Sequence, residues 1–482
     1  MYRLVLYGLI ALTLVSFILT MTGNLRYEWE ILAMIYSLAS LLLSSYVSNL
    51  VFSKVFKVPV NVESFLITAL ILFLILSPAS SPKELAIIAL AGAIAMASKF
   101  LLAPSRKHIF NPAAFSAFVL YVTGLGGAVW WVGDPTMIPF IGIVGALVIR
   151  KIRRFWMFAA FACAWLVSVS LTGVHFGAIF LNPSALLSAI GPTLFFGTIM
   201  LTEPMTTPGT RKLQIAYGAL AGVLLNVSFK IGPIVLIPEI VLMISNVLSY
   251  VTSVRKKFSM SLVERKEISK NVHEFIFNPD GRFSFKSGQY LEWTLPHKRP
   301  DVRGNRRYFT IASSPTEGTI KLGVKFNNPP SSFKKHLLEM ERGSSIFAGQ
   351  LGGDFVLPRD KSKKLVFLAG GIGVTPFRSM VKYLLDKEEK RDITLFYAAK
   401  SEEEVAYKEL FSEAKDKIGL KVRYIVGQVV TKEFIEREVK DFKNHVYYIS
   451  GPEAMVTAFK KMLSAIGVPK LKIITDYFPG FT

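Results

Sequence analysis

The feature that most constrains this chain is a series of long apolar stretches that fills its first half and ends near residue 252. A helix needs about 20 apolar residues to cross the hydrocarbon core of a bilayer. Ten candidate stretches are found, at 4–21, 31–52, 62–78, 84–103, 110–126, 137–150, 155–173, 184–202, 213–229 and 233–252. We therefore expect a polytopic α-helical membrane domain over residues 1–252.

The charged residues divide the chain at the same place. Through Lys257 there are 18 Lys and Arg but only 7 Asp and Glu, whereas the remainder carries 38 and 27. With ten crossings, one side would receive 15 basic residues and the other only Arg26, Lys83 and Lys230. This positive-inside bias predicts a multi-pass protein of the cell membrane, with both termini and the soluble half in the cytoplasm. Much of the net charge of +22 lies in these membrane-flanking loops, which favours membrane lipid over nucleic acid as its explanation.

Short matches within the apolar half indicate an internal repeat. Pro78 and Pro82 recur 126 residues later as Pro204 and Pro208, Pro112 recurs as Pro238, and Ala-Leu-Ala-Gly occurs at 89–92 and 219–222. The shift corresponds to five helices, an odd number, so the two halves would be inverted relative to each other. Inverted repeats often place a site near the bilayer midplane. The alternative is that the prolines only mark loop corners.

After residue 257 the hydrophobic period changes. Short alternating runs at 272–277, 289–295, 307–312 and 319–326 predict an antiparallel β-barrel over 258–358. Strands and helices then alternate at 364–369, 376–387, 392–398, 402–415, 420–425, 431–439, 445–449, 452–466 and 471–474. This rhythm predicts an α/β domain with a parallel sheet over 359–482.

The first of three motifs is Arg307-Tyr308-Phe309-Thr310, on an expected strand. The planar guanidinium of an arginine can neutralise a pyrophosphate. An aromatic ring can cover an isoalloxazine, and a hydroxyl can hydrogen-bond near the flavin N5 atom, where a hydride arrives. The combination suits a flavin nucleotide, although these residue types are also common together on edge strands.

The other two motifs lie at expected strand-to-helix turns. Gly370-Gly371-Ile-Gly373-Val-Thr375-Pro376 follows an apolar strand, and Ser450-Gly451-Pro452-Glu-Ala-Met455 follows another. Glycines let the backbone approach a dinucleotide, and the amino terminus of a helix favours its phosphates. The carboxyl edge of a parallel sheet is where nucleotides bind. Taken alone, the first loop reads equally well as a glycine-rich turn.

In this order and spacing the three motifs resemble the ferredoxin–NADP reductase superfamily over about 258–482. The resemblance implies an FAD-binding barrel followed by a nicotinamide-binding domain. Two departures stand out: Ser450 replaces a cysteine that many members carry beside the nicotinamide ring, and the second pyrophosphate loop reads Pro329-Pro330-Ser331-Ser332 where glycines are usual. The implied catalytic residues are Thr310 and Ser450, and the implied FAD or nicotinamide ligands are Arg307, Tyr308, Phe309, Thr310, Ser331, Ser332, Gly370, Gly371, Gly373, Thr375, Pro376, Gly451, Pro452, Met455, Tyr477 and Phe478.

Two points of this interpretation stay open. Tyr477 and Phe478 either shield the flavin ring or form an apolar terminal strand. Lys400 and Ser401 could meet the 2′-phosphate of NADPH, whereas three following glutamates at 402–404 would repel it. The sequence therefore favours NADH over NADPH only weakly.

The apolar half resembles the NqrB/RnfD family of membrane flavoprotein subunits. The matching segments are Ser77-Pro78 to Pro82, His108-Ile-Phe-Asn111-Pro112 and Thr202-Glu203-Pro204-Met-Thr206-Thr207-Pro208. The resemblance implies a second flavin, FMN or riboflavin, with Asn111, Thr206 and Thr207 as candidate ligands. No Ser-Gly-Ala-Thr-like attachment motif occurs, which argues against a covalent flavin. Asn111 would equally serve as a helix cap before its proline.

Other electron carriers are excluded by composition. Cys163 is the single cysteine, so no iron–sulfur cluster can be held within this chain. The apolar half has only two histidines, His108 and His175, too few for a pair of haems. No metal site is expected.

These observations predict a membrane-bound NAD(P)H dehydrogenase. Hydride would pass to FAD, and single electrons would pass to a membrane flavin and then to quinone or an extracytoplasmic acceptor, such as a flavoprotein partner; ion coupling would fit as well. The alternative, from another functional class, is a transporter or channel with a cytoplasmic redox-sensing flavodomain.

Overall fold

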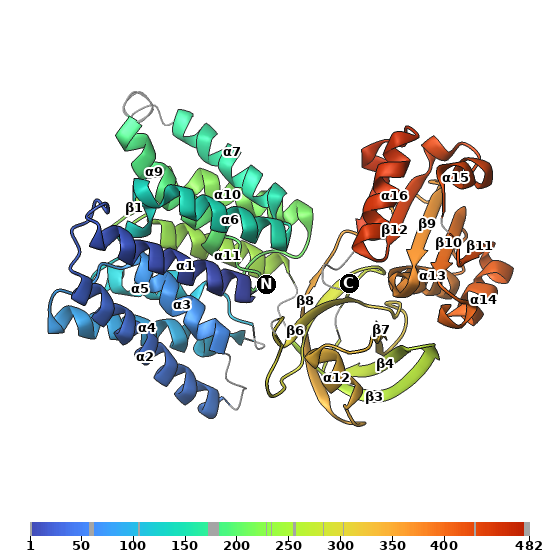
Figure 1. Ribbon diagram of the computed structural model, residues 1–482, viewed down its shortest axis with the longest axis horizontal. Coiled ribbons are helices and arrows are strands. Elements are labelled where there is room, and N and C mark those ends of the chain that lie inside the picture. Colours follow the sequence, from blue (N-terminus) through green and yellow to red (C-terminus); the bar gives the residue numbers. More distant parts are fainter. Residues whose placement is uncertain are drawn as a thin grey trace. The chain divides into compact units, whose positions relative to one another are not determined.

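The computed structural model describes residues 2–56, 62–104, 107–171, 183–227, 229–232, 234–253, 257–282, 284–301, 303–428 and 430–476. The chain separates into two compact units, Met1–Lys256 and Lys257–Thr482. The first unit is helical and the second contains two sheets (Figure 1).

The helical unit has a helix in each of the ten expected ranges. These are α1 (Tyr2–Met21), α2 (Ile31–Val55), α3 (Val62–Ile75), α4 (Pro82–Leu101), α5 (Pro112–Val122), α6 (Ile138–Ile152), α7 (Phe155–Leu171), α9 (Pro183–Phe195, continued by a π-turn over Phe196–Met200), α10 (Arg211–Leu224) and α11 (Pro238–Thr252). Short 3-10 turns at Trp131–Gly133 and Pro135–Met137 precede α6.

Four of the described helical stretches are long and apolar enough to cross a membrane: Tyr2–Met21, Ile31–Val55, Pro82–Leu101 and Pro135–Ile152. Five more are apolar but shorter, and α5, at 11 residues, falls well below the stretch 110–126 expected for it. The expectation of ten crossings therefore goes beyond these four.

The surface of the helical unit is unusually apolar. Among the described residues, every large hydrophobic side chain that is exposed lies between Tyr7 and Val251, except Tyr424 and Leu471. Water-soluble proteins rarely leave such a contiguous apolar surface uncovered. A helical unit of this kind is compatible with a membrane anchor.

The two Ala-Leu-Ala-Gly segments occupy corresponding helix contacts. A Cβ added to Gly92 of α4 would lie 2.3 Å from Ser44 Oγ of α2, and one added to Gly222 of α10 would lie 2.3 Å from the Phe161 carbonyl oxygen of α7. Counting five helices onward from α2 and α4 gives α7 and α10. Both glycines thus permit the close approach of equivalent helices.

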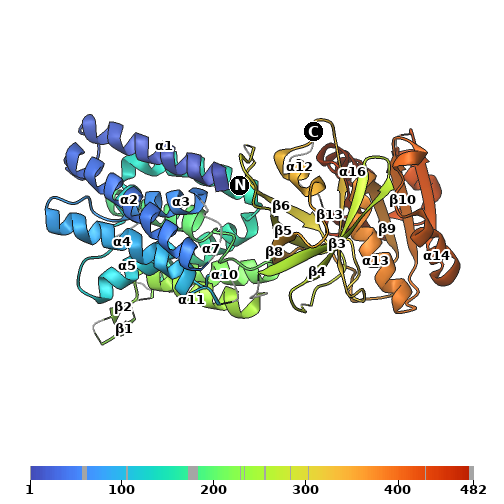
Figure 2. The ribbon, with the colours of Figure 1, turned by 90° about the horizontal axis from the view of Figure 1, so that it is seen from below.

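The start of the last helix differs most clearly from its prediction. The last helix was expected from residue 233, but α11 begins at Pro238. The preceding residues form a two-stranded hairpin, β1 (Lys230–Ile231) and β2 (Ile234–Val235), with Gly232 at a φ of +57°. Figure 2 shows the hairpin at one end of the helical unit, near α11. An apolar run of β-branched residues is compatible with either a strand or a buried helix, which explains the difference.

The second unit opens with a six-stranded antiparallel sheet. Its strands are β3 (Phe258–Ser269), β4 (Val272–Pro279), β5 (Tyr290–Thr294), β6 (Arg306–Thr310), β7 (Ile320–Lys325) and β8 (Ser345–Gly352), in the order β6-β5-β8-β3-β4-β7. A short helix, α12 (Ser332–Leu338), follows β7. The four runs expected from the sequence correspond to β4, β5, β6 and β7, and the sequence predicted neither β3 nor β8.

A five-stranded parallel sheet follows, in the order β11-β10-β9-β12-β13. Its elements are β9 (Leu365–Gly370), α13 (Thr375–Asp386), β10 (Ile393–Ala399), α14 (Lys408–Ile418), β11 (Lys421–Val426), α15 (Lys432–Glu438), β12 (Val446–Ser450), α16 (Glu453–Ala465) and β13 (Ile473–Asp476). Helices α13 and α14 pack on one face and α15 and α16 on the other, each over its own apolar core (Figure 1).

Candidate functional site

The two glycine-rich loops meet at the carboxyl edge of the parallel sheet. Strands β9 and β12 are neighbours, with Ser450 opposite Ala369. A Cβ on Gly373 would lie 2.4 Å from the Ser450 carbonyl oxygen, and a Cβ on Gly451 would lie 2.5 Å from the Met455 Cε atom. Glycine is therefore required for the loops to pack together, and Met455 fills the space beside Gly370. Such an edge, with backbone exposed and a helix beginning, suits a dinucleotide.

The start of α13 is built for this position. Gly371 has a φ of +52°, which favours glycine. A 3-10 turn over Gly371–Val374 leads into the helix, and Pro376 occupies its first turn. Thr375 is buried, and its Oγ1 donates to the Ile372 carbonyl oxygen at 3.2 Å. The motif that begins at Ser450 also leads into a helix: Pro452 directly precedes α16, whose first residue is Glu453.

Thr310 lies where the two sheets of the second unit approach each other. Its hydroxyl is 3.5 Å from Asp476 Oδ2, and Asp476 ends β13 beside Ser450 in the sheet register. Thr310 and Ser450 are both buried. The residues expected to flank the hydride path thus belong to adjoining elements. Tyr477 and Phe478, the candidate ring shields, lie outside the described residues.

Arg307 is held mainly by its own loop. It is buried, and Nη1 donates to the carbonyl oxygens of Arg303, Gly304 and Arg306 at 2.8–2.9 Å, while Nη2 lies 3.1 Å from Asp301 Oδ1. Burial would raise the pKa of Asp301, but the amide of Arg303 and the charge of Arg307 lower it. Arg307 therefore orders the loop before β6 as well as carrying charge.

Four cations converge beside this loop. Lys334, on α12, is buried and donates to the Lys325 carbonyl oxygen. Burial, followed by repulsion from Arg303, Arg307 and Lys325, lowers the pKa of Lys334 from 10.5 to about 8. Asp301 offsets part of the charge of Arg303 and Arg307, and Glu404 part of that of Lys325, but the repulsion that lowers the pKa of Lys334 shows that a further anion would be favourable here. The positive charge of these four side chains fits the pyrophosphate of FAD.

The remaining residues of the first motif have defined surroundings. Tyr308 donates through its hydroxyl to Glu292 Oε2 at 2.9 Å and packs edge-on against Tyr290. Phe309 packs against Phe333, with ring centroids 5.9 Å apart. The segment therefore lies on the sheet as predicted, with alternate side chains on opposite faces.

The two candidate serines of the second pyrophosphate loop have structural partners. Ser331 caps α12 by accepting from the Lys334 amide at 3.3 Å. Ser332 Oγ accepts from the Asp301 amide at 2.9 Å and lies 3.1 Å from His297 Nε2. Both serines lie beside the cationic cluster, but their hydroxyls order the loops around it.

A buried ion pair that the sequence reasoning missed connects the two sheets. Arg378, in the first turn of α13, donates both terminal nitrogens to the Glu317 carboxylate, with Nη2–Oε1 at 3.0 Å. Burial would raise the pKa of Glu317, but Arg378, with Lys321 and the Ser314 amide, lowers it to about 2. A signal was present, because Arg378 stands three and seven positions before the core residues Val381 and Leu385.

The three glutamates after β10 also differ from expectation. The predicted helix 402–415 begins only at Lys408, and Glu402–Glu404 form a 3-10 turn. Each glutamate has a lysine partner: Glu402 with Lys408 at 2.9 Å, Glu403 with Lys270 at 2.6 Å and Glu404 with Lys325 at 2.8 Å. Their charge is thus largely neutralised, and the argument that they repel a 2′-phosphate loses force.

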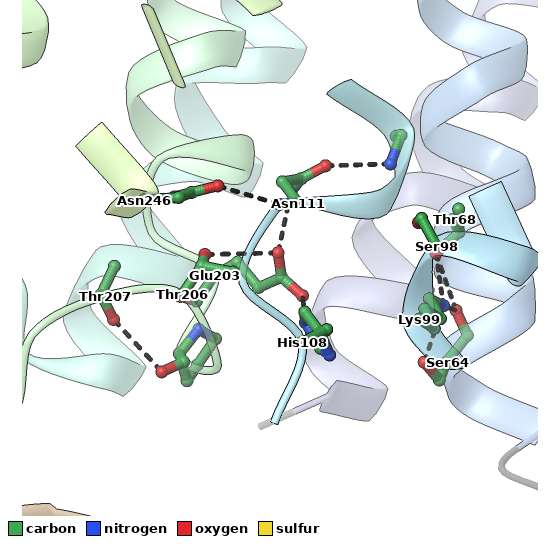
Figure 3. A network of polar contacts seen from close by, with 12 residues as sticks. Ser64, Thr68, Ser98, Lys99, His108, Asn111, Glu203, Thr206, Thr207 and Asn246 are labelled. Atoms are coloured by element: carbon green, nitrogen blue, oxygen red, sulfur yellow. Dashed lines mark hydrogen bonds and ion pairs between the residues drawn. The ribbon is translucent and has the colours of Figure 1, made fainter. Parts of the chain in front are cut away.

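The helical unit contains a second polar cluster (Figure 3). Glu203 accepts from Asn111 Nδ2 at 2.9 Å, lies 3.3 Å from His108 Nε2 and faces Thr206 Oγ1 at 3.4 Å. The backbone N–H of Asn111 in turn donates to Asn246 Oδ1 at 2.9 Å. Three chain segments therefore meet in this cluster, and two of them, 108–111 and 203–206, contribute the contacts of the carboxylate.

Two of the membrane candidates also have local roles. Asn111 Oδ1 accepts from the amides of Ala113 and Ala114, so Asn111 caps α5 as the alternative interpretation proposed. Thr207 Oγ1 donates to the Pro204 carbonyl oxygen at 3.4 Å. Glu239, a buried acid in the first turn of α11, accepts from Trp130 Nε1 at 2.9 Å and lies outside this cluster. Among the residues that the structure describes, no group of three potential metal ligands occurs.

Together, the paired sheets, the facing glycine loops and the cationic cluster define the second unit as a flavin and nicotinamide oxidoreductase module. Residues 367–461 match the oxidoreductase NAD-binding domain family. The chain belongs to the family of oxidoreductase NAD-binding domain-containing proteins and is an NAD(P)H-dependent flavin oxidoreductase.

Individual relatives match part of this chain. Oxidoreductase NAD-binding domain-containing protein 1 of Pongo abelii is 32% identical over 224 residues, which cover 40% of this chain and 70% of that protein. Flavohemoprotein A of Dictyostelium discoideum is 26% identical over 242 residues, 46% of this chain and 60% of that protein. The FAD/NAD-binding domain of a nitric oxide dioxygenase from Vibrio cholerae is 19% identical, with a TM-score of 0.41, and the match covers 46% of this chain and 98% of that structure.

Proposed function

We propose that the chain is a membrane-bound NAD(P)H dehydrogenase that delivers electrons to an acceptor in or beyond the bilayer. The observation that carries the proposal is the meeting of the two glycine loops beside Thr310, on a chain whose other half has an apolar surface. Bound FAD would supply an acceptor for a hydride, two electrons and one proton, and would release the electrons singly.

The chain's own residues divide this task. The backbone at Gly371, Gly373 and Gly451 receives the nicotinamide nucleotide, because side chains there would fill its place or strain the loops. Arg307 and Lys334 provide positive charge for a pyrophosphate. Thr310 offers a hydroxyl at the flavin edge, and Ser450 closes the nicotinamide side.

For the membrane half we propose ten crossings arranged as inverted repeats, with the reductase unit in the cytoplasm. The corresponding contacts of Gly92 and Gly222 support the repeat. We further propose that a second flavin, FMN or riboflavin, binds near Asn111, Thr206 and Thr207, and that quinone or an extracytoplasmic redox partner is the final acceptor. Ion coupling stays part of the proposal.

Flavin analysis of detergent-purified protein tests this function. The protein would be acid-precipitated, the released flavins separated by chromatography, and the pellet examined for covalent flavin fluorescence. FAD together with a second flavin supports the transmembrane path. FAD alone, at one per chain, contradicts the second flavin and favours direct quinone reduction or a redox-sensing transporter. These two are then separated by NADH-dependent reduction of a short-chain quinone.

A further inference from the structure

Helix α13 contacts the chain segment that follows β6, the strand that carries the proposed flavin motif. We call β6 the flavin strand. Helix α13 begins at the nucleotide loop, and Arg378 and Ser379 lie in its first turns. Arg378 Nη1 donates to the Ala312 carbonyl oxygen at 3.1 Å, and Ser379 Oγ donates to the Ser313 carbonyl oxygen at 2.6 Å. Ala312 and Ser313 come two and three residues after Thr310. Hydrogen bonds thus join the segments expected to hold the nicotinamide ring and the flavin ring.

The Arg378–Glu317 pair makes this connection rigid. Its two parallel bonds fix both the direction and the distance of the guanidinium. The side chains are only 7% and 13% exposed. Lys321 Nζ contacts Glu317 Oε1 at 2.8 Å from the other side, and the Ser314 amide donates to Glu317 Oε2 at 2.7 Å. Glu317 therefore contacts two other residues of the turn 312–321, Ser314 and Lys321, and links this turn to α13 through Arg378.

A second charged contact between the sheets provides a comparison. Lys270 lies in the turn between β3 and β4 and contacts Glu403 Oε2 at 2.6 Å. These two side chains are 60% and 67% exposed, so solvent and salt screen their attraction. The two pairs join the same two domains but differ in burial and in geometry.

We propose that Arg378 is a positioning residue, which holds the nicotinamide loop against the flavin strand at the separation that hydride transfer requires. The proposal rests on the proposed reductase function. In the step concerned, the C4–H bond of the dihydronicotinamide breaks, and its two electrons and proton move to the flavin, leaving NAD(P)⁺. Such transfers need the reacting atoms roughly 3–3.5 Å apart, and a displacement of about 1 Å can cost on the order of 100-fold in rate.

Arg378→Lys in the full-length, FAD-loaded protein tests the proposal, because lysine keeps the charge but loses the two-pronged contact. Ser379→Ala removes the second bond of the same helix. Lys270→Ala is the matched control, since it breaks an exposed contact between the same domains. The first readout is the limiting rate of flavin reduction at saturating NADH or NADPH. The second is hydrogen–deuterium exchange of the amides in 312–321, in the apo and the loaded protein.

We expect Arg378→Lys to slow flavin reduction roughly 10- to 100-fold and Ser379→Ala to slow it less. FAD content and nucleotide affinity should remain near the wild-type values, and exchange in 312–321 should increase. Lys270→Ala should change neither readout. A purely structural role would instead lower the melting temperature and the FAD content while leaving the limiting rate per bound flavin unchanged.

An unchanged limiting rate in Arg378→Lys overturns the proposal, and so does a rate loss accounted for entirely by lost FAD. If Arg378→Lys fails to fold, Ser379→Ala decides by the same two readouts. A wild-type protein whose flavin is reduced by dithionite but by neither nucleotide overturns the reductase function instead. The exchange data on the apo protein then still decide whether Arg378 anchors the segment.

Discussion

Glycine permits close packing in both units of this molecule, but with different consequences. In the helical unit, Gly222 lets α10 approach the backbone of α7, and the space is filled by protein. In the reductase unit, Gly373 and Gly451 let two loops meet at a sheet edge where a ligand can reach the backbone. In both units the missing Cβ atom permits close packing, but only in the reductase unit does this packing form a candidate binding edge. Substitutions in the helical unit should therefore lower stability alone, whereas those in the reductase loops should also slow flavin reduction.

The largest effect is expected at Gly373→Glu. Its Cβ would clash with the Ser450 carbonyl oxygen, and its carboxylate would repel the nucleotide phosphates. Flavin reduction by NADH or NADPH should fall by about 100-fold or more, equivalent to roughly 3 kcal/mol. Reduction by dithionite should continue normally, as followed by flavin absorbance.

Gly318→Ala is the control for this variant, because no atom lies within 4 Å of the added Cβ. If Gly373→Glu were reduced by NADH or NADPH at the wild-type rate, the loop around Gly373 would not be part of the nucleotide site.

Gly222→Leu should show the opposite pattern. The added side chain meets the Phe161 carbonyl oxygen and the Trp165 amide, so the helical unit should lose about 1–3 kcal/mol of stability. Thermal unfolding in detergent measures this loss. The hydride step should remain at the wild-type rate, since α10 belongs to the other unit.

Val223→Leu, at a position 45% exposed, is the matched control on the same helix. A Gly222→Leu protein as stable as the wild type would contradict the packing role.

Lys334→Met should weaken FAD binding about 10-fold, or ~1.4 kcal/mol, because a cation facing the pyrophosphate is lost. The apo protein should gain stability, because the lowered pKa of Lys334, about 8, means that its charge is unfavourable in the folded state. That unfavourable charge is present below pH 8 and disappears as the pH rises from about 8 to 10.5, so stability should rise over this interval.

FAD titrations at about pH 7 and about pH 9.5 measure the linkage, and wild-type affinity should be lower at the higher pH. Exposed Lys335→Met is the control. If Lys334→Met and Lys335→Met bound FAD with equal affinity, Lys334 would not contact the pyrophosphate, and the prediction would be wrong.

The smallest effect is expected for Lys270→Ala. Its contact with Glu403 is exposed, and exposed ion pairs contribute little. The rate of flavin reduction should change by less than about twofold. A larger loss would show that the exposed contact, too, sets the geometry of the reductase unit.

Sequence patterns predicted the strands of the parallel sheet closely, because β9, β10 and β12 are short buried runs and a glycine follows or ends β9, β11 and β12. They predicted β6 from the short alternating run at 307–312. Patterns could not reveal that Arg378 pairs with Glu317, because the partners are 61 residues apart and meet only when the two sheets pack. Nor could they show that Glu402, Glu403 and Glu404 are each neutralised by a lysine.

In the helical unit the ten helices could be located from hydropathy, but their ends could not. The hairpin at Lys230–Val235 and the π-turn after α9 interrupt apolar runs that read as continuous helix. The cluster at Glu203 was anticipated only as separate residues, because Asn111 and Asn246 reach one another through the packing of α5 and α11.

Anaerobic rapid mixing of the purified protein with NADH and, separately, with NADPH tests the central claim most directly. If the glycine loops and Thr310 form one hydride-transfer site, at least one nucleotide should bleach the flavin absorbance completely in a single fast phase. Deuterium at the transferred C4 position should slow that phase. A flavin that dithionite bleaches, but that neither nucleotide reduces, would contradict the account.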